Sequence, residues 1–113
     1  MPILQSTQEY VDRIRLLNNQ KNYAIVAHHY TRYLGDLSGG QAMKRIVLNM
    51  FPEDFHSGIS FYEFPDILNF NDFKVAYRTR LDSLSIDDEL GQSIIQEAKL
   101  AFQLNMNITE ALL

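Results

Sequence analysis

The segment from Tyr30 to Gln41 most constrains how this chain can fold, because it places three glycines inside what otherwise has the pattern of one long helix. The helical pattern runs from about Tyr23 to Met50, and we expect Pro52 to end it. A glycine in a helix interior lowers stability by roughly 1 kcal/mol relative to alanine, and Gly/Ser pairs are a recognised cause of kinks. We therefore predict that this helix bends between residues 35 and 40.

Two explanations account for a glycine cluster at this place. Without Cβ atoms, Gly35, Gly39 and Gly40 leave a bare strip of backbone that a flat, bulky ligand can approach, with Asp36 and Ser38 as the polar groups beside it. The alternative is close packing of another helix against the same strip. The residues by themselves leave both explanations open.

The rest of the chain predicts an all-α fold of about four helices. The spacing of Ser6 and Glu9 is that of a capping box, so a first helix should begin there and end near residues 18–20. Between residues 53 and 71 the periodicity disappears, and the aromatic residues there indicate an ordered loop. We expect Asn71 to cap a third helix that ends near Ser83 and carries Phe73 on its apolar stripe.

A fourth helix is predicted to begin at Ser85, with Asp88 three residues later, and to run nearly to Leu113. Asn105 falls on the side of this helix that we expect to be buried. The apolar residues of that side are Leu90, Ile94, Ala98, Ala101, Phe102, Ile108 and Leu112.

Composition limits the class of protein. The 113 residues are enough for one domain, and we expect that domain to span residues 1–113. A net charge of −4 argues against nucleic acid as a partner, and no apolar run approaches the ~20 residues that cross a bilayer. We find no pattern of a secretory signal, so we expect a cytoplasmic protein without a membrane partner. The absence of cysteine excludes disulfides and thiolate metal sites.

Three groups of residues could carry chemistry. Lys74 and Arg78 lie four apart, which puts two cations on one helix face: either a solvated basic face or a site for a pair of carboxylates. Asp36 in a helix interior requires hydrogen-bond donors or water if it is buried, either in a functional or in a structural polar network. His28 could bind a metal through its imidazole, and it lies on roughly the same helix face as Gly35, which follows it by seven residues.

The uninterrupted sequence Tyr-Thr-Arg-Tyr-Leu-Gly-Asp-Leu-Ser-Gly-Gly-Gln at residues 30–41 resembles the distal-helix signature of heme oxygenases. The resemblance extends from Thr7-Gln8-Glu9-Tyr10-Val11 through Phe61-Tyr62-Glu63-Phe64 and Tyr77-Arg78-Thr79-Arg80 to residues 97–102. It covers nearly the whole chain and is similar to the C-terminal half of the family's catalytic domain. It implies a half domain of that fold, lacking the N-terminal half with its proximal histidine.

The resemblance also implies roles for individual residues. Asp36 would orient waters that deliver protons to bound oxygen, in a catalytic network whose other members are Tyr10, Arg32, Tyr33 and Asn105. Lys74 and Arg78 would bind the heme propionates, with Tyr30 as a further contact. The remaining heme-binding positions are Gly35, Ser38, Gly39, Gly40 and Phe102. The family's proximal histidine lies outside this chain, so we assign no metal ligand among these residues.

By this resemblance the reaction is oxidative cleavage of heme to biliverdin, carbon monoxide and iron. Heme would be both substrate and cofactor, O2 the oxidant, and a ferredoxin or an NADPH-dependent flavoprotein reductase the electron donor. A catalytically silent heme-binding or helical interaction module, or an incomplete gene product, are the alternatives. We also expect the apolar faces to be covered by a second copy or by a complementing N-terminal half.

Overall fold

The computed structural model describes residues 2–51 and 53–113, except for the side chains of residues 54–57. The described residues are helical throughout their regular structure and contain no strand, which confirms the all-α class. The chain forms two compact units, Met1–Thr31 with Ile86–Leu113, and Arg32–Ser85. Each unit is described by itself.

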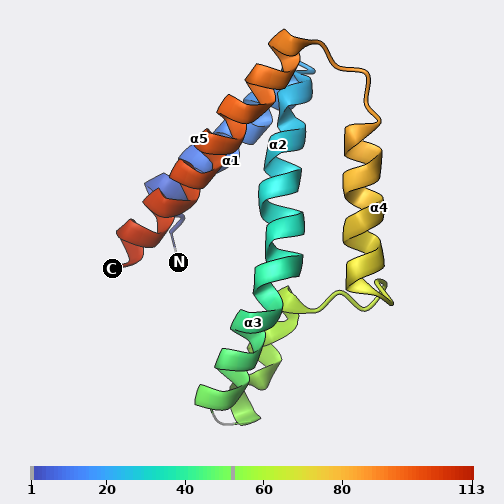
Figure 1. The fold of residues 1–113 in the computed structure, drawn as a ribbon. Coiled ribbons are helices and arrows are strands. Elements are labelled where there is room, and N and C mark those ends of the chain that lie inside the picture. Colours follow the sequence, from blue (N-terminus) through green and yellow to red (C-terminus); the bar gives the residue numbers. More distant parts are fainter. Residues whose placement is uncertain (1, 52) are drawn as a thin grey trace. The chain divides into compact units, whose positions relative to one another are not determined.

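The first unit consists of α1 (Gln5–Asn19), the 3₁₀ turn η1 (Tyr23–Ile25), the short α2 (Val26–His29) and α5 (Asp88–Leu112). α1 packs along α5, and η1 with α2 packs on the same long helix (Figure 1). Small buried side chains at Ala24, Ala27 and Ala101 allow this close approach, and Leu17 is 1% exposed.

Helix starts in the structure differ from the predicted ones by a few residues. Among the described residues no side chain caps α1, so the predicted capping box at Ser6 is wrong. α5 begins after Asp87, whose carboxylate accepts from the backbone N–H of Leu90 at 2.7 Å, so Asp87 takes the role predicted for Ser85. Both residue types are good caps, and the hydrophobic pattern alone does not choose between neighbouring candidates.

The second unit begins with residues 32–34 and continues with α3 (Gly35–Met50), the 3₁₀ helix η3 (Glu53–Tyr62) and α4 (Phe70–Asp82). η3 returns along α3 (Figure 1), and Gln41 Nε2 donates to the Tyr62 carbonyl at 2.8 Å. The segment predicted as an irregular loop is therefore helical in its first part. Asn69, rather than Asn71, caps α4 by accepting from the N–H of Asp72 at 3.1 Å.

A change in backbone hydrogen bonding interrupts the long helix just before the glycines. Residues Tyr30–Leu34 form a π-helical segment, η2, and α3 then runs as a regular α-helix through Gly35, Gly39 and Gly40. None of the described glycines has a positive φ. The bend predicted between residues 35 and 40 stays a prediction, because an α-helix can curve while it keeps its backbone hydrogen bonds.

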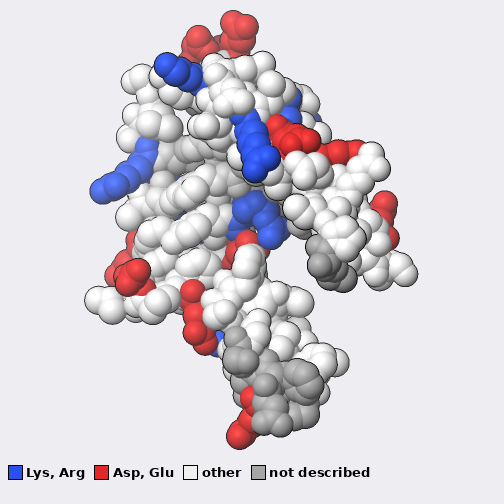
Figure 2. All heavy atoms as spheres, turned by 180° about the vertical axis from the view of Figure 1, so that it is seen from behind, with Lys and Arg blue, Asp and Glu red and all other residues white. Residues whose placement is uncertain are grey.

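Charged side chains of both signs are interspersed with uncharged surface on the face shown in Figure 2. Within the described residues, none of the helices combines the length and the apolar character that a membrane span requires.

Candidate functional site

The π-helical segment leads directly into an ion pair. Arg32 Nη2 lies 3.3 Å from Asp36 Oδ2, and Asp36 is 25% exposed. No cation follows Asp36 at a spacing of four residues in the sequence. Its partner is instead Arg32, four residues before it. π-helical turns occur frequently at functional sites. The position of Asp36 directly after such a turn is therefore consistent with a functional role for its carboxylate.

The three glycines divide into two kinds. A Cβ placed at Gly35 or Gly39 would have no described heavy atom within 4 Å outside its own helix, so this face of α3 is open. A Cβ at Gly40 would lie 2.8 Å from Cδ1 of Tyr62 in η3. Close packing therefore explains the absence of a side chain at residue 40. The bare backbone strip that was predicted to face a ligand is reduced to Gly35 and Gly39.

Tyr33, predicted as a member of the proton network, packs in an aromatic cluster of the second unit. Its ring centroid is 5.6 Å from that of Phe64 and 6.1 Å from that of Phe73. Within α4, the ring centroid of Phe73 is 6.3 Å from that of Tyr77. The predicted apolar stripe of α4 thus faces this cluster.

A pocket of about 560 Å³ lies between α3 and the start of α4. Its lining brings together two predicted heme-binding residues, Ser38 and Lys74. Lys74 is half-buried and Arg78 is exposed, and neither forms an ion pair with a described residue. Two cations without anionic partners remain available for carboxylates. The other lining residues are Leu37, Gln41, Ile67, Leu68, Asn69, Phe70 and Asn71.

The remaining predicted site residues belong to the first unit. Tyr10 is 7% exposed and Asn105 is half-buried, whereas Tyr30 is 37% exposed. Phe102 is 59% exposed, so its predicted place on the buried side of the last helix is wrong; the buried stripe of α5 runs through Glu97, Ala101 and Leu104. The proposed meeting of Tyr10 and Asn105 with Asp36 stays a prediction.

Sequence reasoning missed a polar cluster formed by Arg13 of α1, His28 of α2 and Glu97 of α5, in which His28 and Glu97 are buried and Arg13 is 35% exposed. Arg13 Nε and Nη2 donate to Glu97 Oε1 and Oε2 at 2.9 and 2.7 Å. His28 Nε2 lies 2.7 Å from Glu97 Oε1, and these two side chains are 4% and 5% exposed. The spacing of Glu97 from Ala101 and Leu104, four and seven residues, is the signal that could have found it.

The carboxylate of Glu97 is stabilised in its charged form. The hydrogen bond from Arg13 lowers the pKa of Glu97, burial opposes this shift, and the hydrogen bond with His28 lowers it further. Since Nε2 of His28 is engaged by this carboxylate, the imidazole is held as part of a helix-joining cluster. Among the described residues, no group of three or more His, Asp or Glu side chains could hold a metal ion.

The family model described as heme oxygenase matches residues 1–111. The chain belongs to the heme oxygenase family. It is 44% identical over 107 residues to the heme oxygenase of Rhodella violacea, covering 95% of this chain and 46% of that protein. To human heme oxygenase 1 it is 40% identical over 113 residues, covering 99% of this chain and 39% of that protein.

Among solved structures, the heme oxygenase of Leptospira interrogans superimposes with a TM-score of 0.84 at 50% identity. The match covers 93% of this chain and 51% of that one. The chain thus spans about half the length of the heme oxygenases that it matches.

A heme oxygenase site needs a helix surface that a flat macrocycle can approach, a polar group beside it, and cations for two carboxylates. The open strip at Gly35 and Gly39, the Arg32–Asp36 pair, and the cations of Lys74 and Arg78 fit these needs. All of these residues lie within the second unit.

Proposed function

We propose that this chain takes part in the oxidative cleavage of heme to biliverdin, carbon monoxide and iron, using O2 and electrons from a ferredoxin or an NADPH-dependent flavoprotein reductase. The observation that carries this proposal is the open backbone strip at Gly35 and Gly39 beside the Arg32–Asp36 pair. A cytoplasmic location stays a prediction.

Heme is the substrate, and when bound it supplies the iron at which O2 is activated. In the proposal, the backbone at Gly35 and Gly39 approaches the macrocycle, and Lys74 and Arg78 hold its propionates through charge-assisted hydrogen bonds. Those contacts fix its orientation relative to Asp36.

Asp36 controls protons in this proposal. Its Oδ2 accepts from Arg32, and a carboxylate offers about four acceptor positions, so others remain for water on the 25% of the side chain that is exposed. A water held there delivers a proton at a defined place, which steers the reaction toward attack on the macrocycle edge.

We propose that the proximal iron ligand comes from outside these 113 residues. His28 supports this, because Glu97 engages its Nε2 and its Nδ1 is buried, so neither nitrogen is exposed to offer a lone pair to a metal. A complementing polypeptide with the N-terminal half of the fold is the partner that would supply it. Self-association of the chain stays a prediction.

A silent heme-binding or helical interaction module is the second candidate, favoured by the match to about half of each relative. Hemin titration of the chain mixed with a complementing N-terminal half of the fold, followed by addition of reductase and O2, separates the two. Formation of biliverdin supports the oxygenase, and a stable Soret band that persists under reduction contradicts it and supports the binder.

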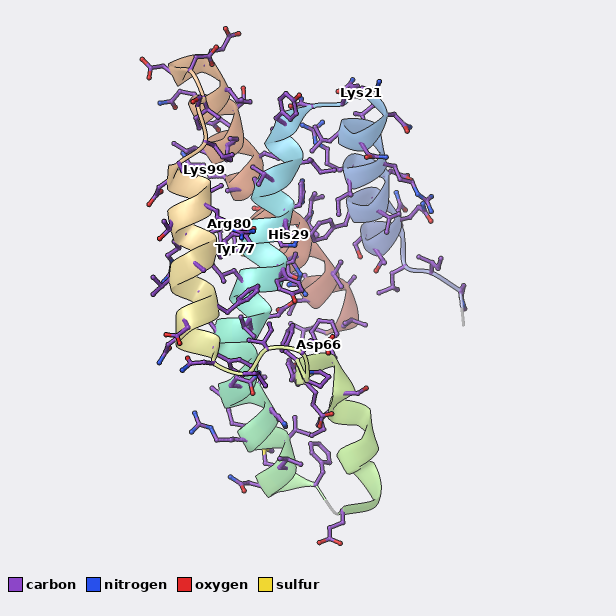
Figure 3. The ribbon with its side chains drawn as sticks, turned by 90° about the vertical axis from the view of Figure 1, so that its right-hand side faces the viewer. Lys21, His29, Asp66, Tyr77, Arg80 and Lys99 are labelled. Atoms are coloured by element: carbon purple, nitrogen blue, oxygen red, sulfur yellow. The ribbon has the colours of Figure 1, made fainter. Side chains whose placement is uncertain are left out.

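The role of Asp36 is tested by Asp36→Ala, with Asp66→Ala as control. Asp66 is an exposed carboxylate in the connection between η3 and α4 (Figure 3). We expect Asp36→Ala to consume heme while the biliverdin formed per heme falls by about tenfold or more, since positioned proton transfer contributes about 10²–10⁴-fold. A normal biliverdin yield from Asp36→Ala would contradict the assigned role.

A further inference from the structure

Tyr10 is held by the polar cluster of Arg13, His28 and Glu97 in two ways. Its ring centroid lies 5.7 Å from that of His28, at an interplanar angle of 54°. Arg13 lies three residues further along α1, on the same side of the helix as Tyr10, and donates two hydrogen bonds to Glu97. Glu97 therefore holds α1 in its rotation about the helix axis through Arg13. It also holds the imidazole ring of His28, which the Tyr10 ring contacts.

The same carboxylate sets the state of the His28 ring. A carboxylate oxygen accepts, so the 2.7 Å contact places a proton on His28 Nε2. The other ring nitrogen, Nδ1, is buried and has no hydrogen-bond partner among the described residues. Glu97 is thus the group that determines which ring nitrogen carries the proton and which edge of the ring is turned away from α5.

We propose that Glu97 is a positioning residue for Tyr10, acting through His28 and Arg13. Glu97 does not itself touch the substrate in this proposal. It keeps the Tyr10 ring where the proton network requires it. The effect on biliverdin formation rests on the proposed function, whereas the position of the Tyr10 ring does not.

The burial of His28 and Glu97 favours a positioning role over simple stabilisation. Replacing a buried ion pair by well-packed apolar residues is often neutral or stabilising, so stability alone does not explain why three helices meet at charged and polar side chains. Directional hydrogen bonds fix ring and helix orientation, which apolar contacts do not.

The test is Glu97→Gln in the full chain, with Glu89→Gln as the matched control. Glu89 is exposed and lines the same pocket of about 570 Å³ as Glu97 and Arg13, so the control removes one negative charge nearby without disturbing the cluster. The first readout needs no heme: nitrogen NMR of His28 and aromatic proton shifts of Tyr10, measured well below the unfolding temperature.

We expect Glu97→Gln to move the Tyr10 ring resonances and the His28 nitrogen shifts, and Glu89→Gln to leave both at their original positions. Unchanged Tyr10 resonances in a folded Glu97→Gln protein would overturn the proposal. If Glu97→Gln does not fold, Arg13→Lys supplies the same test, because it keeps the positive charge and loses the two-pronged geometry.

The second readout is the biliverdin formed per heme when a complementing N-terminal half of the fold is present. Glu97→Gln should lower it by about fivefold, a small part of the contribution of positioned proton transfer, while hemin affinity stays within about twofold. If wild type produces biliverdin, an unchanged yield from Glu97→Gln would overturn the proposal. If wild type forms none, the proposed function fails, and the NMR result still decides whether Glu97 positions Tyr10.

Discussion

Gly39 and Gly40 are neighbours in the sequence and face different surroundings. The position of a Cβ at Gly39 is open, whereas one at Gly40 would lie 2.8 Å from the ring of Tyr62. A methyl group added at Gly39 improves helix propensity by up to about 1 kcal/mol. At Gly40 the same gain is opposed by overpacking, which is typically about 1–3 kcal/mol unfavourable.

We therefore predict that Gly40→Ala lowers the free energy of unfolding by about 1 kcal/mol, while Gly39→Ala raises it. Urea unfolding at constant pH measures both, and the two changes should have opposite signs. A stabilised Gly40→Ala protein would mean that Tyr62 moves aside freely.

The open face at Gly39 predicts a different effect of a larger side chain. Gly39→Leu should weaken hemin binding by about tenfold or more without loss of stability, because its side chain occupies space that only a ligand would use. Gly58→Leu is the matched control, since Gly58 lies in η3 and is equally open. Hemin titration compares the dissociation constants, and equal affinities for the two variants would show that the macrocycle does not approach α3 there.

At the scale of helices, α4 presents Lys74 and Arg78 four residues apart. The double variant Lys74→Ala with Arg78→Ala should weaken hemin binding, since each hydrogen bond to a charged group contributes about 1.5–3 kcal/mol before solvent screening. Arg45→Ala with Arg80→Ala is the charge-matched control, because both side chains are exposed. Equal hemin affinities in the two double variants would identify the pair as a solvated basic face.

The Arg13–His28–Glu97 cluster joins α1, α2 and α5, and it makes stability depend on pH. The pKa of Glu97 is lowered from its ordinary value of 4.5, chiefly by Arg13. Its contribution to stability is therefore complete above about pH 4.5 and is lost as the pH falls through the lower, folded-state pKa. The hydrogen bond with Glu97 raises the pKa of Arg13, which therefore stays charged throughout this range.

We predict that the unfolding free energy of wild type falls more steeply with acid below pH 4.5 than that of Glu97→Gln. Near pH 7 the variant should be less stable by about 1–3 kcal/mol, the effect of leaving buried hydrogen-bonding groups unsatisfied. Urea titrations across this pH range measure both quantities. Parallel curves for the two proteins would show that Glu97 has the same pKa in the folded and unfolded states.

Hydrophobic periodicity predicted α1 and α5, whose buried residues recur along one face. It also predicted α4, which has no fully buried residue, but it missed the 3₁₀ helix η3. Exact starts were missed where two good capping residues stand close together, as Ser85 and Asp87 do. The π-helical turn at Tyr30–Leu34 was not predicted, because no residue type in this segment is specific for a π-helix. Glu97 was missed because periodicity counts apolar residues, and a buried charge requires knowledge of its partners on other helices.

At the scale of the molecule, the chain divides into two compact units, and the predicted site residues are shared between them. The second unit contains the open glycine strip, Asp36 and the two cations, while the first contains Tyr10 and Asn105. The central claim is our proposal that the glycine strip, Asp36 and the two cations of the second unit form the proton-controlling side of a heme oxygenase site.

That claim is tested most directly by mixing this chain with the part of the L. interrogans heme oxygenase that it does not match, and measuring biliverdin formed from hemin with a reductase and O2. We predict a heme-binding complex that produces biliverdin, and a yield that collapses when the chain carries Asp36→Ala. A complex that binds hemin but returns no biliverdin, or one whose yield is indifferent to Asp36, would contradict it.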